Sequence, residues 1–235
     1  MKILVNGASI SRGENTWPYY LQKQLDCELV NLALAGCGNT YIYESTVAEL
    51  SRRSYDLVLI MWAEFGRIDL RVDKIEQFAD SKNTSVYQSQ QNDWPSKIIY
   101  PVNDQDYVQK NWIFSLGHLQ GQRDSVSTVV APLHRLQSHS QLLEADITKI
   151  IGLQAVIKNL QVPYLFMHWK SLKKFNRFDQ LYAMVNWDNF YTNTCLELIA
   201  KENNWLAADG IHPGAEAHKF YANLIAQRIK NSHFG

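Results

Sequence analysis

Three residues of the types that form a nucleophilic triad stand near the two ends of the chain: Ser9 near one end, and Asp209 with His212 near the other. A serine hydroxyl attacks well when a histidine takes its proton, and that histidine needs a carboxylate to fix its tautomer and stabilise the imidazolium. The three-residue spacing, with Gly210 between, lets Asp209 reach one ring nitrogen of His212 while the other points outward. Each residue alone would be an ordinary turn or capping residue. Together they predict a triad, if the fold brings the chain ends to one place.

A regular alternation of strands and helices must position these residues. The run at 56–62 (DLVLIMW) is nearly all apolar, as in a parallel strand covered on both faces. The predicted strands are residues 3–5, 28–34, 56–62, 162–168 and 205–207. One predicted helix begins at residues 16–18 and the last begins at Pro213. The other predicted helices span residues 40–53, 142–160 and 188–203. This alternation predicts an α/β fold, a three-layer α/β/α sandwich around a parallel five-stranded sheet, in one domain over residues 1–235.

The middle of the chain, about residues 67–140, differs in character from the rest. It is rich in Gln, Asn, Asp and Ser, has scattered aromatic residues and shows poor periodicity. We interpret it as an irregular insertion that covers or flanks the functional site, partly helical near residues 105–119, because a loop-rich segment of this length is seldom structureless in a compact domain.

Ligands collect at the carboxyl ends of the strands in open parallel sheets, where the loops diverge. Four segments of the predicted fold fall there. Ser9 follows the first strand, residues 36–39 the second, 63–67 the third and 209–212 the fifth. The prediction is therefore that the residues capable of chemistry meet at one edge of the sheet.

Composition excludes several other classes of protein. The 23 basic residues match the 23 acidic ones, so no net field attracts nucleic acid or an anionic membrane. Cys27, Cys37 and Cys195 form no CxxC pair, and the seven histidines form no His-Glu-x-x-His motif, so no disulfide framework, metal site or metal cofactor is predicted. No apolar run reaches the ~18 residues of a membrane span, and the amino-terminal run is too short for a signal peptide. We expect a cytoplasmic protein.

Three short motifs occupy the predicted loops. The first is Gly7-Ala8-Ser9 with Gly13 behind it, the second is Asn31 with Gly36 and then Gly38-Asn39, and the third is Asp209, His212 and Pro213 before the long last helix. These motifs resemble the sequence blocks of the SGNH, or GDSL-like, hydrolases, a family of esterases, lipases and carbohydrate deacetylases. The resemblance covers both ends of the chain and implies the SGNH, flavodoxin-like form of the predicted sandwich.

The resemblance also implies a role for each matched residue. Ser9 would be the nucleophile, His212 the general base and Asp209 the residue that orients it. The backbone N–H groups of Ser9 and Gly36 would form the oxyanion hole, where one donor contributes about 3 kcal/mol as negative charge develops. No cofactor is implied.

Two positions depart from the family pattern. Ala8 replaces the aspartate that usually precedes the serine. That aspartate is not a triad residue. Ala63 stands where the family has its oxyanion-hole asparagine, a loss that costs ~100-fold or more in rate if nothing replaces it. Asn39 or a group from the 64–67 turn is the candidate replacement, although Glu64 and Arg67 can equally pair with each other.

The resemblance implies a serine ester hydrolase that removes O-acyl groups, such as acetyl groups, from a small-molecule or carbohydrate ester. Because of Ala63, a catalytically degenerate binding module with the same fold remains an alternative. A short-chain dehydrogenase is a further alternative, since residues 2–9 (KILVNGAS) are also similar to the start of that family. However, Ile10, Ser11 and Arg12 stand where that family needs glycines to approach the cofactor pyrophosphate.

Overall fold

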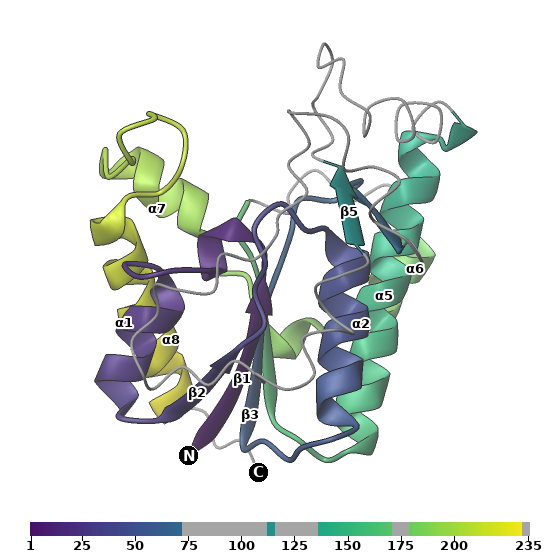
Figure 1. Ribbon diagram of the computed structural model, residues 1–235, viewed down its shortest axis with the longest axis horizontal. Coiled ribbons are helices and arrows are strands. Elements are labelled where there is room, and N and C mark those ends of the chain that lie inside the picture. Colours follow the sequence, from purple (N-terminus) through teal and green to yellow (C-terminus); the bar gives the residue numbers. More distant parts are fainter. Residues whose placement is uncertain (72–111, 116–135, 171–178, 232–235) are drawn as a thin grey trace.

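The computed structural model describes residues 1–71, 112–115, 136–170 and 179–231. Its centre is a five-stranded sheet in the order β2-β1-β3-β6-β7, and every neighbouring pair of strands is parallel (Figure 1). The strands are β1 (Lys2–Gly7), β2 (Glu28–Asn31), β3 (Leu57–Trp62), β6 (Tyr164–His168) and β7 (Phe190–Tyr191). The prediction of a parallel five-stranded α/β sandwich is confirmed.

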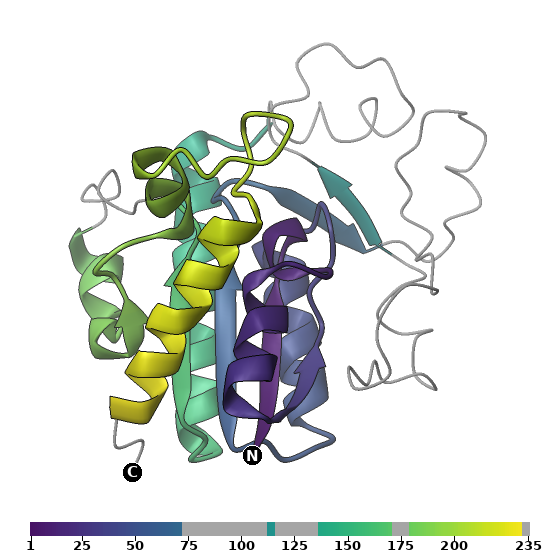
Figure 2. The ribbon, with the colours of Figure 1, turned by 90° about the vertical axis from the view of Figure 1, so that its left-hand side faces the viewer.

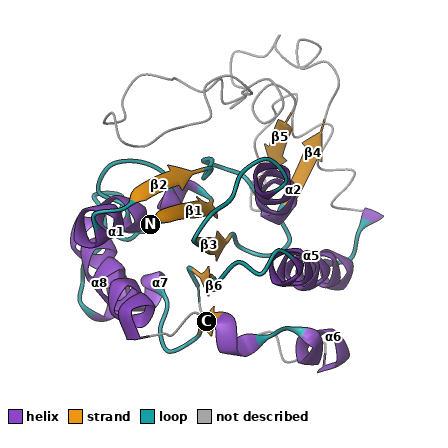
Figure 3. Cartoon of the chain, turned by 90° about the horizontal axis from the view of Figure 1, so that it is seen from below, coloured by secondary structure: helices purple, strands orange, loops and turns teal. Residues whose placement is uncertain are grey.

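Helices cover both faces of this sheet and produce three layers, which are plain in the view from below (Figure 3). One face carries α1 (Trp17–Leu25), α7 (Leu196–Glu202) and α8 (Ala215–Asn231). The other carries α2 (Asn39–Leu50), α5 (His139–Asn159) and α6 (Asp179–Met184). Seen from the side of the first layer, α1 and α8 run next to each other over the sheet (Figure 2).

The alternation of side chains along each strand supplies a core for each layer. In β1, Ile3 and Val5 are fully buried with residues of α1, α7 and α8, whereas Leu4 is fully buried with residues of α2 and α5. In β3 all six residues are buried. A strand that packs against helices on both faces must be apolar throughout, which is why its sequence is a continuous apolar run.

The order of the strands bears on the dehydrogenase alternative. Here β1 lies next to the edge strand β2, and β3 follows on its other side. This is the flavodoxin-like order, whereas dinucleotide-binding folds have the order 3-2-1-4-5-6 with β1 at the switch point in the middle of the sheet. The topology therefore argues against a short-chain dehydrogenase.

Two predicted elements near the end of the chain were wrong. The fifth strand of the sheet is the two-residue β7, which lies within the segment predicted as the first part of a helix at 188–203. Residues 205–207 are not a strand of the sheet. Their Leu206 forms an isolated antiparallel bridge with Pro213 instead.

Part of the predicted insertion is also described. Strands β4 (Ile68–Arg71) and β5 (Trp112–Ser115) pair in antiparallel fashion as a separate two-stranded sheet beside α2. The helix predicted near 105–119 is therefore wrong at 112–115. The remainder of that helix, and most of the insertion, lie outside the described residues.

Candidate active site

The loop from Asp209 to His212 is organised by the Asp209 carboxylate. Its Oδ1 accepts hydrogen bonds from the backbone N–H groups of Ile211 and His212 at 2.9 and 3.0 Å, and Gly210 makes the turn with a φ of +68°. Its Oδ2 lies 2.5 Å from Nδ1 of His212. These hydrogen bonds, the one from the His212 N–H above all, hold the pKa of Asp209 well below its usual range. The carboxylate is therefore charged and fixes the imidazole with its other nitrogen, Nε2, unpaired in the described part of the chain.

Backbone contacts close this loop at its base. Leu206 bridges Pro213, the Ala207 N–H donates to the His212 carbonyl at 2.7 Å, and the Gly214 N–H donates to the Trp205 carbonyl at 2.7 Å. The apolar residues 205–207 thus pair with residues 212–214 and hold the Asp209–His212 loop in place. They do this instead of forming the predicted strand of the sheet.

Ser9 begins the short 3-10 helix η1 (Ser9–Ser11), directly after β1. Its side chain is exposed, while the neighbouring Ala8 and Ile10 are buried. Within the described residues, neither the Ser9 hydroxyl nor its backbone N–H hydrogen-bonds another protein group. The residue is therefore presented outward, at the carboxyl end of a central strand, with both groups available to a ligand.

The turn that holds Ser9 is anchored at Ser11, which is fully buried. Its carbonyl accepts from Nδ2 of Asn31 at 2.7 Å, and its hydroxyl accepts from Nε1 of Trp17 at 3.0 Å. Gly7 is required beside it, because a Cβ there would lie 2.5 Å from the Ser11 Oγ. The asparagine of the second motif thus fixes the turn that carries the serine of the first.

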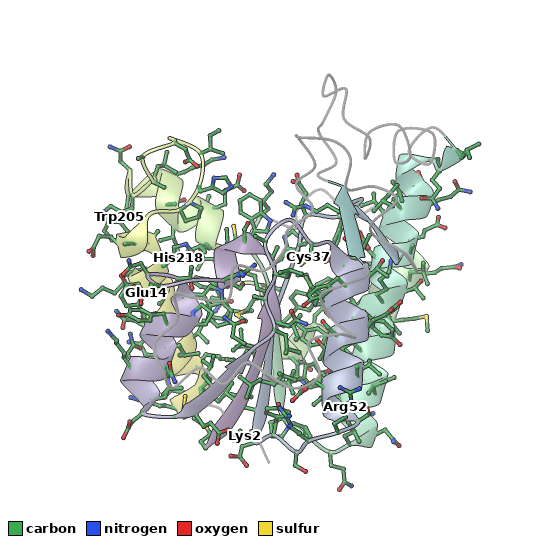
Figure 4. The ribbon with its side chains drawn as sticks, in the orientation of Figure 1. Lys2, Glu14, Cys37, Arg52, Trp205 and His218 are labelled. Carbon is green, nitrogen blue, oxygen red and sulfur yellow. The ribbon has the colours of Figure 1, made fainter. Side chains whose placement is uncertain are left out.

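The two ends of the chain are connected through α1 and α8. The Trp17 N–H, at the start of α1, donates to Nδ1 of His218 in the first turns of α8 at 3.2 Å. His218 is buried on this side of the sheet (Figure 4). The first turn of α1 follows the Ser9 segment and the first turn of α8 follows the His212 loop, so both lie at the same end of this helical layer (Figure 2).

The loop after β2 supplies the second predicted oxyanion donor. It lies against the end of β1, because the Leu34 N–H donates to the Gly7 carbonyl at 3.1 Å and the Cys37 Sγ lies 3.4 Å from the same oxygen. Gly36 turns the chain with a φ of +82°, a conformation that favours glycine. Its N–H hydrogen-bonds no other group in the part of the chain that the structure describes.

Asn39 is fully buried at the start of α2, and its side chain faces Ala63. Oδ1 accepts from the Ala63 N–H at 2.9 Å, and Nδ2 lies 3.5 Å from the Ala63 carbonyl. Nε2 of His168 lies 3.0 Å from the same carbonyl. The residue at the family's asparagine position is therefore held firmly by its backbone, and Asn39 already has a partner other than a substrate.

Glu64 and Arg67 have different partners, so their predicted alternative pairing with each other was wrong. Glu64 forms an ion pair with Lys170 at 2.7 Å, which joins the loops after β3 and β6. Arg67 donates to the Cys37 carbonyl at 3.1 Å. Neither contact supplies a replacement for the missing asparagine.

The described residues hold neither a metal-binding group of side chains nor a membrane-spanning helix. They contain no group of three or more His, Cys, Asp or Glu side chains able to hold a metal ion. Across residues 1–71, 112–115, 136–170 and 179–231, no helix combines the length and apolarity needed to cross a bilayer.

Comparison with known proteins identifies the fold. No protein-family model and no curated protein sequence matches the chain. Among solved structures it is similar to TesA, at 14% identity and a TM-score of 0.53 over 98% of both chains. It is similar to the psychrotrophic esterase EstA from Pseudoalteromonas sp., inhibited by monoethylphosphonate, at 14% identity and a TM-score of 0.51 over 97% of this chain and 96% of that one.

A third similar structure is a catalytic mutant, aspartate to alanine, of an acetylxylan esterase from Geobacillus stearothermophilus. It shares 13% identity at a TM-score of 0.50, over 99% of this chain and 95% of that one. The comparisons, together with the sheet order, confirm that the chain has the SGNH-type α/β fold that its motifs predicted.

Proposed function

We propose that this protein is a serine ester hydrolase of the SGNH type, in which Ser9, His212 and Asp209 form the catalytic triad. The hydrogen bond between Asp209 and His212 carries this proposal, because it leaves a half-exposed imidazole (52% exposed) with Nε2 free to accept a proton. The exposed Ser9 at the end of β1 supports it, since α1 and α8 bring both segments to one end of the molecule.

In the proposed reaction, the Ser9 oxygen attacks the ester carbonyl carbon while its proton passes to Nε2 of His212. Asp209 stabilises the resulting imidazolium through Nδ1. The oxyanion of the tetrahedral intermediate accepts hydrogen bonds from the N–H groups of Ser9 and Gly36. The bond to the alcohol oxygen then breaks, and the alcohol leaves with the proton from His212. Water attacks the acyl-enzyme by the same route, releasing the carboxylic acid and restoring Ser9.

The substrate class is proposed as O-acyl esters of small molecules or carbohydrates, with acetyl esters first among them. The similar fold of an acetylxylan esterase supports this choice. The aromatic residues Trp94, Tyr100 and Trp112 of the insertion suit stacking on a sugar ring, and they suit the core of the insertion equally well. Their side chains lie outside the described part of the chain.

We also propose a cytoplasmic location. Cys27, Cys37 and Cys195 are all free and buried, a state that a reducing compartment maintains. Expression of a tagged chain followed by cell fractionation tests this, and recovery in an extracellular fraction would oppose it.

Labelling with a fluorophosphonate probe tests the nucleophile. Wild type should be labelled and should hydrolyse p-nitrophenyl acetate, whereas Ser9→Ala and His212→Ala should lose both by about 1,000-fold or more, because the hydroxyl or its base is gone. Ser54→Ala is the matched control for label position, since Ser54 is also exposed but precedes β3, at the opposite end of the strands from Ser9. Equal labelling of wild type and Ser9→Ala would refute the proposed function.

A degenerate binding module is the second candidate, and Ala63 favours it. With Ala63 in place of asparagine, the proposed oxyanion hole has only two backbone donors, and the Ala63 N–H is already bonded to Asn39. If wild type neither reacts with the probe nor hydrolyses the ester, yet binds acetylated oligosaccharides in calorimetry, this second candidate is the correct one.

A further inference from the structure

Strand β4, at the base of the insertion, sends a carboxylate into the start of α2. Asp69 is buried, and its Oδ1 accepts from the Gly38 N–H at 2.6 Å while its Oδ2 accepts from the Tyr41 N–H at 2.9 Å. The first N–H groups of a helix lack partners within the helix, and a nearby side-chain oxygen usually satisfies them. Here the N-cap residue is Gly38, which has no side chain, so a different strand provides the cap.

The fit between β4 and this turn is close. A Cβ on Gly38 would lie 2.8 Å from the Arg67 Cβ and 2.9 Å from the Asp69 Oδ1. Arg67, just before β4, also donates to the Cys37 carbonyl at 3.1 Å. The segment 67–69 therefore holds the Gly36–Gly38 turn through two hydrogen bonds, on Cys37 and Gly38, the residues directly after the proposed oxyanion donor. A third hydrogen bond, from the Tyr41 N–H to Asp69, holds the first turn of α2.

A second buried carboxylate supports the neighbouring loop. Asp146 of α5 accepts from the Gly66 N–H at 2.8 Å and lies 3.3 Å from Nζ of Lys149. Burial raises the pKa of Asp146, while Lys149 and hydrogen bonds from the Gly66 N–H and the Asn39 side chain oppose that shift. Two buried carboxylates, Asp69 and Asp146, thus hold the loops after β2 and β3. The sequence patterns did not predict either of them as a site residue.

We propose that Asp69 is a positioning residue of the oxyanion hole, which holds the Gly36–Gly38 turn so that the Gly36 N–H faces the reacting carbonyl. This inference rests on the proposed function and deepens it. It gives the insertion a role in the reaction, because the strand that begins the insertion fixes a loop of the site.

Burial raises the pKa of Asp69 to about 7, although the Tyr41 and Gly38 N–H groups oppose the shift. Among the described residues, the charged or titratable groups that act on it are Asp146 and Lys149 of α5, Cys37 of the turn and Tyr41 of α2. Arg67 and Arg12 act on Cys37 in the same turn. Protonation near neutral pH would remove an acceptor and loosen the turn. The hydrogen bonds that hold Gly38 and Tyr41 should therefore be strongest above about pH 8 and weaker as the pH falls through 7, because an ionised carboxylate accepts more strongly than a protonated one. This local loosening is separate from the stability of the whole fold, to which a buried neutral Asp69 contributes more than a charged one.

The test compares Asp69→Asn with wild type and with Glu49→Gln. Glu49 is the matched control because it is a buried carboxylate that bonds Tyr55 and Arg53, and it caps no loop at the carboxyl edge. At about pH 8, kcat for p-nitrophenyl acetate should fall about ten-fold in Asp69→Asn with KM within two-fold, since a misplaced donor acts on the transition state. At about pH 5.5 the same ratio should shrink below three-fold, because wild-type Asp69 is then also neutral. The other groups of the site are the same in both proteins, so their pH dependence cancels from the ratio.

Hydrogen exchange provides a readout that does not depend on activity. Amides 36–41 should exchange about ten-fold faster in Asp69→Asn than in wild type or Glu49→Gln, while amides of α1 stay unchanged. A ratio of kcat that is equal at both pH values, or unchanged exchange at 36–41, would overturn the proposal. Failure of the proposed function is recognised separately, as hydrolysis that survives Ser9→Ala, and hydrogen exchange then still decides whether Asp69 holds the turn.

Discussion

The Asp209 carboxylate serves both the shape of its loop and the orientation of His212. One oxygen receives two backbone N–H groups, and the other receives the imidazole. Both side chains are about half exposed, at 47% and 52%. Exposed pairs of this kind contribute little to folding stability because water screens them. A well-formed pair with little value for stability is what the proposed triad requires of these two residues.

Replacement of Asp209 by asparagine should therefore separate activity from folding. An amide oxygen can still accept hydrogen bonds from the two backbone N–H groups, but the NH2 group cannot accept a hydrogen bond from the Nδ1–H of His212. We expect kcat for p-nitrophenyl acetate to fall by about 100- to 10,000-fold, with the melting temperature within about 2 °C of wild type. Asp188→Asn, at another exposed aspartate, is the control and should leave both unchanged. A normal kcat in Asp209→Asn would remove Asp209 from the triad.

At the same scale, the sequence indicated some site residues and missed others. Ser9, Asp209 and His212 could be predicted because their side-chain types suit a triad and Asp209 lies three residues before His212. Asp69 and Asp146 were not, because their partners are backbone N–H groups of loops distant in sequence. Only the fold creates such contacts, so neither carboxylate has a local pattern to reveal it.

Elements followed the sequence where burial is continuous. Strand β3 and helix α5 were predicted close to their observed bounds, since β3 is a continuous apolar run and α5 is long enough to show apolar residues at helical spacing. Strand β7 was missed because two residues are too few to show a period. Residues 205–207 are apolar enough for a strand, yet they pair with the histidine loop rather than with the sheet.

The contact between β4 and α2 gives a prediction that belongs to elements. Gly38→Ala should lower the free energy of unfolding by about 1–3 kcal/mol, because the new methyl group overlaps Arg67 and Asp69. Gly152→Ala is the matched control in α5, where the nearest atom is a Tyr43 ring carbon at 3.4 Å. Alanine favours helix there by about 0.5–1 kcal/mol. Urea unfolding measures both, and equal effects of the two changes would contradict the close fit of β4.

Across the whole molecule, the layer of α1, α7 and α8 joins the beginning of the described chain to its end. Its core contains the large buried residues Trp17, Leu21 and Tyr221. The proposed site lies at one end of this layer. At that end His218 adds a polar contact, because its Nδ1 accepts a hydrogen bond from the Trp17 N–H. Because a protonated imidazole cannot accept at Nδ1, the junction of the two ends requires a neutral His218.

Acid should therefore weaken this junction measurably. Burial lowers the pKa of His218 to about 4, below the ordinary value of about 6.5 in an unfolded chain. Between these values the unfolded state binds more protons, so the contribution of His218 to stability is full above about pH 6.5 and is lost as the pH falls toward 4. His168, with its pKa also lowered to about 4, acts in the same direction. Asp69 acts in the opposite direction, because its raised pKa makes its contribution grow as the pH falls below 7.

These opposing contributions make a comparison with one variant more informative than the wild-type curve alone. In His218→Asn the amide oxygen can accept from Trp17 at every pH, and the titrating group is gone. The advantage of wild type over His218→Asn should be constant above about pH 7.5 and should decline by roughly 2–3 kcal/mol between pH 6.5 and 4. Urea unfolding across this range measures the difference, with the values above pH 7.5 as the baseline. If the two proteins lose stability in parallel, His218 is not held neutral at the junction of α1 and α8.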